Sequence, residues 1–136
     1  MISGISEMPI TDESYPFSSA ERYCHLSAKG YVEREYRVDG TANVYRTADE
    51  DGGVEVMTAD APYSNRIVVR APKDPAQASG NVVVEIINPT SFMEIERMWI
   101  LGYGEFVRSG DIYVGITSKP NTIAKLKEFN PDRYAF

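Results

Sequence analysis

The chain has 136 residues, 43% hydrophobic and 25% charged, which is the composition of one ordinary globular domain. Its net charge of −6 argues against a general affinity for nucleic acid, because phosphates attract clustered lysines and arginines. No apolar stretch approaches the roughly 20 residues that cross a bilayer, and the N-terminus lacks a signal-peptide pattern. With one cysteine, Cys24, the sequence predicts a cytoplasmic protein without internal disulfides or membrane contact.

The N-terminal half is predicted to hold an arm, a short helix and antiparallel strands. Residues 1–17 contain two prolines and are predicted to be an irregular arm whose apolar residues lie against the domain. Residues 18–30 have helical spacing, with a serine at the start and Gly30 at the end. Residues 31–72 are predicted to be antiparallel strands, with a turn at the Asp-Gly-Thr of 39–41.

The C-terminal half has the pattern of a parallel sheet. Residues 82–87 and 112–117 are near-continuous apolar runs, typical of strands buried on both faces. A helical pattern separates them, so residues 81–117 are predicted to form a βαβ unit with parallel strands. Residues 118–136 follow as a loop and one short helix. The predicted class is therefore α/β, with too few strands and helices for a complete sheet.

The helix between the two apolar runs has candidate end signals. Ser91 and Glu94 have the spacing of a capping box, and Gly110 stands where a helix would close. The Asn-Pro-Thr-Ser of residues 88–91 is then explained as a turn followed by a cap. On spacing alone, this structural interpretation is favoured over a binding site.

Position in the sheet favours the alternative, a functional site. Ligands of open α/β sheets bind beyond the carboxyl ends of the parallel strands, which are residues 88–91 and 118–121 here. Ser118 and Lys119 are therefore candidates for the edge of a pocket. No other feature of the sequence competes with this edge as the location of a site.

Two further features contain residue types that can carry chemistry. Glu85 lies inside an apolar strand, where an unpaired charge costs several kcal/mol. It is predicted to pair with Arg66 or Arg70, and a catalytic role is the less favoured alternative. Cys24 and His25 are adjacent, and neighbouring helical residues point about 100° apart, so a packed cysteine beside a surface histidine is favoured over a catalytic dyad.

Sequence motifs for cofactors and catalysis are missing. One histidine and one cysteine cannot make a zinc site of recognisable spacing, and no glycine-rich phosphate loop joins a strand to a helix. No Gly-x-Ser-x-Gly occurs. The sequence predicts neither metal nor cofactor, and taken alone it contains no complete catalytic constellation.

Four stretches resemble a known family. They are GTANVY (40–45), RIVVRAP (66–72), GNVVVEIINPTS (80–91) and GDIYVGITSKPNTIAKLKEFNPDRYA (110–135). They are similar to the N-terminal part of bacterial α/β-hydrolase domain proteins, and the last stretch is the most specific. The resemblance implies that residues 1–136 are the N-terminal part of a single hydrolase domain, in which 82–87 is the third strand and 112–117 the fourth.

The same resemblance changes the interpretation of residues 88–91. In that fold the loop after the third strand supplies part of the oxyanion hole. Pro89 has no N–H, so the backbone donor would be Thr90 or Ser91. The side chain of Asn88 would orient the loop or donate a hydrogen bond itself.

The resemblance also implies that the chemistry is shared with other sequence. The family's nucleophile follows the fifth strand, with the acid and histidine later, so all three are expected beyond Phe136. The first hypothesis is the N-terminal segment of an esterase-like serine hydrolase, inactive alone, acting on a small acyl substrate when complete. The alternative is a non-catalytic binding module. In either case the rest of the domain, or a second copy, is expected to cover the sheet edge after residues 112–117.

Overall fold

The structure, a computed structural model, describes residues 1–48 and 52–136. In these ranges the strands form a five-stranded sheet of order β1-β2-β3-β5-β4. The strands are β1 (Ile2–Glu7), β2 (Tyr31–Thr47), β3 (Val54–Pro72), β4 (Val82–Ile86) and β5 (Ile112–Ile116). The α-helices are α1 (Ala20–Cys24), α2 (Arg97–Ser109) and α3 (Pro120–Phe129), and the 3-10 helices are η1 (Leu26–Lys29), η2 (Pro75–Gln77) and η3 (Thr90–Phe92).

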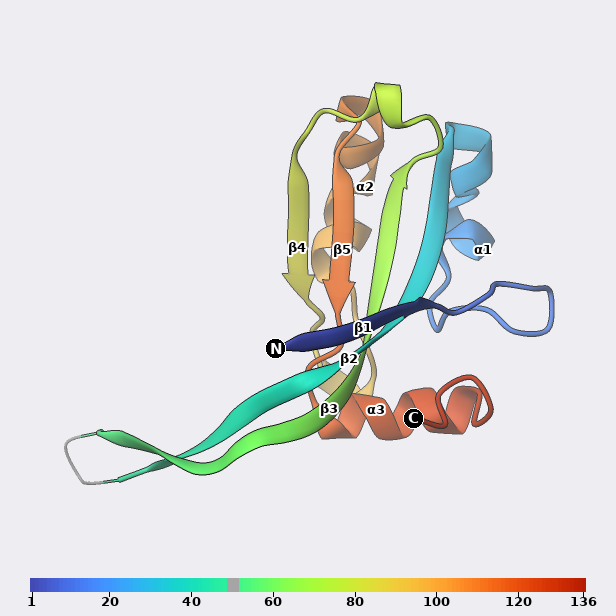
Figure 1. Cartoon of the computed structure of the whole chain (residues 1–136). Coiled ribbons are helices and arrows are strands. Elements are labelled where there is room, and N and C mark those ends of the chain that lie inside the picture. Colours follow the sequence, from blue (N-terminus) through green and yellow to red (C-terminus); the bar gives the residue numbers. More distant parts are fainter. Residues whose placement is uncertain (49–51) are drawn as a thin grey trace.

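The pairing of the strands confirms the predicted fold class. β1, β2 and β3 pair antiparallel in sequence, and β3 pairs antiparallel with β5. β4 and β5 are parallel and are joined through α2, which makes the βαβ unit (Figure 1). Gly110 ends α2 in the left-handed conformation, as its position predicted. The result is a mixed α/β sheet in which antiparallel strands lead into a parallel pair.

The predicted turn at residues 39–41 was wrong. β2 runs straight through it and pairs with β3 as a long hairpin, whose outer part projects from the sheet (Figure 1). Gly40 serves close packing rather than a turn: a Cβ there would lie 2.4 Å from the carbonyl oxygen of Met1. The glycine therefore lets the start of β1 approach β2.

The N-terminal arm was only partly irregular. Residues 2–7 form β1, an edge strand that pairs with residues 36–40 of β2, whereas residues 8–17 contain neither helix nor strand. Backbone pairing holds β1 while most of its side chains remain exposed. Because β1 buries few side chains, residues 2–7 need no alternating hydrophobic pattern, and the sequence therefore carries no signal that predicts this strand. The helix predicted over 18–30 is interrupted at His25, which has a φ of 51°.

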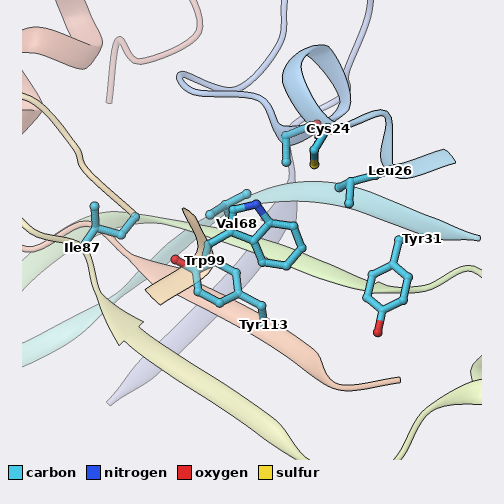
Figure 2. Close-up of a cluster of buried hydrophobic side chains, with 8 residues drawn as sticks. Cys24, Leu26, Tyr31, Val68, Ile87, Trp99 and Tyr113 are labelled. Atoms are coloured by element: carbon cyan, nitrogen blue, oxygen red, sulfur yellow. Dashed lines mark hydrogen bonds between the residues drawn. The ribbon is translucent and has the colours of Figure 1, made fainter. Parts of the chain in front are cut away.

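One face of the sheet carries the hydrophobic core. The buried cluster joins α1, η1 and α2 to β2, β3 and β5 (Figure 2). Trp99 of α2 is fully buried, with its ring centroid 5.1 Å from that of Tyr113. Val68 and Ile87 are also buried within it. Because α1 and α2 share this cluster, both helices cover the same face, which places them behind the sheet in Figure 1.

β4 is not buried on both faces, contrary to the prediction. Val82, Val84 and Ile86 are 56%, 55% and 68% exposed, and they alternate with side chains that face α2. The open edge also differs from the prediction, because β5 pairs with β3 on one side and β4 on the other. In the described ranges, β4 pairs only with β5, so the open edge at this end of the sheet is β4 and not β5.

Candidate functional site

The candidate site is the loop that joins β4 to α2 at the carboxyl ends of the parallel strands. Asn88 and Ile95 form a backbone bridge across its base, with N···O distances of 3.2 and 3.0 Å. The bridge closes the loop into a narrow neck and leaves residues 89–94 as its tip. Position therefore agrees with the edge where ligands of such sheets bind.

Asn88 organises the first half of this tip. Its Oδ1 accepts a hydrogen bond of 2.7 Å from the Thr90 amide and a second, short one from the Thr90 hydroxyl. This is an Asx turn, in which the side chain replaces a backbone acceptor. The orienting role expected for Asn88 is therefore possible in this geometry, whereas the Thr90 amide is already engaged within the loop.

Ser91 has an unusual backbone conformation. Its φ is 64° and that of Phe92 is 57°, so two successive non-glycine residues are left-handed. Such strain is uncommon and collects at functional sites. The predicted capping box was wrong: α2 begins at Arg97, five residues after the start that a Ser91 N-cap would give, and Ser91 lies in η3 instead. The strained backbone cannot start an α-helix directly, which is the physical reason for the difference.

A cavity of about 450 Å³ lies between this loop and α3. Its lining includes Ser91 from the loop and Asn121 and Lys125 from α3. The predicted pocket-edge residues Ser118 and Lys119 are exposed but do not line it. Lys119 instead starts α3, where its carbonyl oxygen accepts from the Thr122 hydroxyl at 2.8 Å and from the Thr122 amide at 3.1 Å.

Sequence reasoning missed the α3 side of this cavity, although a signal was present. Asn121, Lys125 and Glu128 are spaced by four and three residues, and all three line the cavity. That spacing places them on one helical face. A search for polar residues on one face of the helix predicted after residues 118–121 would have found them.

The predicted ion pair of Glu85 with Arg66 or Arg70 is not formed. Its carboxylate accepts hydrogen bonds from the amides of Met98 (3.1 Å) and Trp99 (3.4 Å) in the first turn of α2. It also accepts from the Tyr113 hydroxyl at 2.6 Å. Burial and the carboxylates of Glu96 and Glu85 raise the pKa of Tyr113, so its hydroxyl remains a donor. Glu85 is thus a helix cap supplied by a strand.

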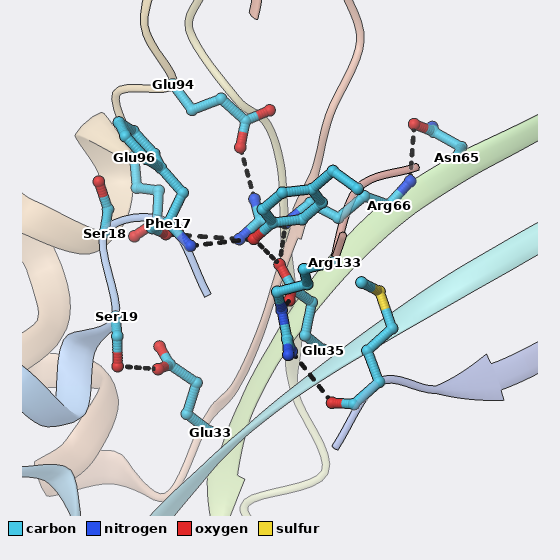
Figure 3. A network of polar contacts seen from close by, with 12 residues as sticks. Phe17, Ser18, Ser19, Glu33, Glu35, Asn65, Arg66, Glu94, Glu96 and Arg133 are labelled. Carbon is cyan, nitrogen blue, oxygen red and sulfur yellow. Dashed lines mark hydrogen bonds and ion pairs between the residues drawn. The ribbon is translucent and has the colours of Figure 1, made fainter. Parts of the chain in front are cut away.

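The two arginines are instead the centres of two buried Glu–Arg–Glu triads, of which Figure 3 shows the one around Arg66. Arg66 contacts Glu35 of β2 and Glu94 of the loop, and both carboxylates are buried with it. Burial opposes the charged guanidinium, but the two carboxylates outweigh it and the pKa of Arg66 is raised. The sequence predicted Glu94 only as part of a capping box and predicted no role for Glu35, because the burial of both depends on contacts between distant segments.

The second triad repeats the arrangement beside the first. Arg70 donates to Glu33 of β2 at 2.7 Å and to Glu96 at 3.0 Å, and it lies 4.6 Å from the ring centroid of Trp99. Burial raises the pKa of Glu96, and the charge of Arg70 opposes that shift without cancelling it. The two triads together tie residues 94–96 to β2 and β3.

Cys24 and His25 do not form a dyad. The Cys24 thiol is buried and donates to the carbonyl oxygen of Ala20 at 3.0 Å, whereas His25 is exposed in a left-handed conformation. In residues 1–48 and 52–136 no three His, Cys, Asp or Glu residues are grouped so as to hold a metal ion. No helix in these ranges is long and apolar enough to span a membrane.

The sheet, the crossover helix and the carboxyl-edge loop define an α/β domain. A family model described as alpha/beta hydrolase domain matches residues 6–136. The chain belongs to this family, and the resemblance inferred from sequence is confirmed. No curated protein and no solved structure matched the chain.

Proposed function

We propose that this chain is the N-terminal segment of a serine hydrolase that cleaves ester or similar acyl bonds, with the 88–91 loop contributing to the oxyanion hole. The observation that carries the proposal is the left-handed backbone of the exposed residue Ser91 at the carboxyl edge of the parallel strands. Membership of the hydrolase family supports a hydrolytic reaction. Strain of this kind is tolerated where backbone groups must face a ligand.

The chemistry selects one donor among the candidates. When a serine attacks an acyl carbon, the carbonyl oxygen becomes an oxyanion that backbone N–H groups stabilise. Pro89 has no N–H, and the Thr90 amide already donates to Asn88. We therefore assign the Ser91 amide as the donor and Asn88 as the residue that shapes the turn. Lys125 lines the adjacent cavity and would face the acyl substrate.

The remaining catalytic groups are proposed to come from polypeptide outside residues 1–136. Two facts support this. The sequence lacks Gly-x-Ser-x-Gly. Its one histidine, His25, is exposed, and the adjacent Cys24 thiol is buried and donates its hydrogen bond to Ala20 rather than to His25. We also propose a cytoplasmic location, because a reducing compartment would keep the Cys24 thiol free. Cell fractionation tests that location.

Ester hydrolysis tests the proposal. The 136-residue chain should neither turn over p-nitrophenyl acetate nor take up a fluorophosphonate label, whereas an in-frame longer form should do both. In the longer form, Ser91→Gly should keep kcat, because glycine retains the amide and accommodates a φ of 64°. Turnover by the short chain would refute the proposed place of the nucleophile. A large loss in Ser91→Gly would assign the donor to the hydroxyl instead.

A second candidate is a non-catalytic module that binds another polypeptide through the β4 edge. The observation in its favour is the exposure of Val82, Val84 and Ile86 on a strand with one described partner. The rest of the hydrolase domain or a second copy would cover this edge. Light scattering after size exclusion tests it: Val84→Lys should abolish association. A compact monomer before and after the change would argue against edge binding.

A further inference from the structure

The tip of the candidate loop is held from outside by one side chain. Among hydrogen bonds and ion pairs of the described residues, the Arg66–Glu94 pair is the one that links residues 89–94 to the rest of the chain. The bonds of Thr90 stay within the loop, on Asn88. The conformation of the tip therefore depends on where the guanidinium of Arg66 stands.

Arg66 is itself fixed from the side opposite the loop. Its Nε donates to Glu35, which also accepts from Arg133 at 2.6 Å and from the Tyr134 hydroxyl at 2.9 Å. The side chains of Arg66 and Glu35 are 2% and 0% exposed. Figure 3 shows this chain of contacts running from Arg133 through Glu35 and Arg66 to Glu94. The buried guanidinium is held by Glu35, and Glu35 is held in turn by Arg133 and Tyr134. Arg66 therefore cannot move aside and presents a rigid contact to the loop.

Glu94 is poorly satisfied apart from this contact. Its Oε1 is buried and has no hydrogen-bond partner among the described residues. A buried carboxylate with an unpaired oxygen is unfavourable, and an apolar side chain would fill such a place at lower cost. A contribution to stability therefore explains the charge of Glu94 poorly, whereas a need to fix the position of the loop tip explains it well.

We propose that Arg66 is a positioning residue for the 88–95 loop, acting through the carboxylate of Glu94. Its relevance to catalysis rests on the oxyanion role proposed above, but its effect on loop geometry does not. Because Glu94 lies near the end of the loop in sequence and Asn88 at its start, the ion pair fixes the second half of the loop while the Asx turn fixes the first. The Ser91 amide stands between these two fixed points.

Hydrogen exchange of the 136-residue chain tests the proposal without any substrate. Glu94→Gln should speed exchange of the Thr90 and Ile95 amides roughly tenfold or more, as loss of one charge-assisted hydrogen bond implies. The Ile87 amide, bonded to Ile116 in the sheet at 2.9 Å, should not change. Glu33→Gln is the matched control, since it neutralises an equally buried arginine partner outside the loop.

Unchanged exchange at Thr90 and Ile95, or an equal rise at Ile87, would overturn the proposal. If Glu94→Gln does not fold, Glu94→Asp keeps the charge and shortens the reach, and it should loosen the same amides to a smaller extent. Where the longer form hydrolyses esters, Glu94→Gln should lower kcat with little change in KM. Absence of esterase activity would count against the proposed function alone, because the exchange result stands apart from it.

Discussion

Replacement of Glu85 is the most direct test of how the loop and α2 are held. Glu85→Leu puts an apolar side chain of comparable size in this place and removes the acceptor for two α2 amides and for the Tyr113 hydroxyl. Loss of a helix cap costs about 1 kcal/mol. A buried hydroxyl left without its acceptor costs about 1–3 kcal/mol more. The free energy of unfolding should therefore fall by about 3 kcal/mol, with Glu85→Gln losing about half as much because one acceptor oxygen remains.

Thermal and urea unfolding followed by circular dichroism measure this difference. A domain of this length loses about 10 °C in Tm for about 3 kcal/mol. Glu128→Gln is a suitable control, because the exposed ion pair of Glu128 with Lys125 should contribute at most about 1 kcal/mol. If Glu85→Leu were as stable as the wild type, the carboxylate would not be acting as the cap.

Three further outcomes follow from single sites. Gly110→Ala should destabilise by about 2 kcal/mol, since φ is 79° and the added Cβ would lie 2.3 Å from the Gln77 carbonyl oxygen, whereas Gly104→Ala in the open middle of α2 should stabilise by about 0.5–1 kcal/mol; melting curves compare them. The pKa of Glu96 is raised in the folded state, so its contribution to stability is present at low pH and is lost as pH rises through that pKa. As the pH is lowered from 7 to 5, the free energy of unfolding of the wild type, measured by urea titration, should rise relative to that of Glu96→Gln. Burial raises the pKa of the Cys24 thiol, so Ellman's reagent should label it in denaturant and not in the native chain; equal rates would contradict its burial.

Local patterns were enough to predict the parallel part of the fold. The apolar runs at 82–87 and 112–117 and the glycine at 110 depend on neighbours in sequence, and the structure has β4, α2 and β5 there. β1 and the long hairpin were missed because backbone pairing with distant residues decides them. The exposed face of β4 was missed for a related reason, since an apolar run is the same whether one face or both are covered.

The candidate site shows the same division. The order of strand and helix along the chain placed residues 88–91 at the carboxyl edge of the sheet. The missing N–H of Pro89 limited the candidate backbone donor to Thr90 or Ser91. The Asx turn at Asn88, the left-handed Ser91 and the use of Glu85 as a cap are conformational facts that spacing did not contain. The prediction of an arginine partner for Glu85 was wrong, because four other glutamates occupy Arg66 and Arg70 and neutral donors satisfy Glu85.

Those four glutamates share a spacing that links the sheet to the loop. Glu33 and Glu35 on β2, and Glu94 and Glu96 at the end of the loop, are each two residues apart, or roughly 7 Å in extended chain, so both members of a pair face the same way. The arginines on β3 between them are four residues apart and also share a face. A shift of one residue between β2 and β3 would turn these charges to the uncovered face, where no described loop could meet them. We therefore expect the buried charges to cost stability and to specify the β2–β3 register that seats the loop.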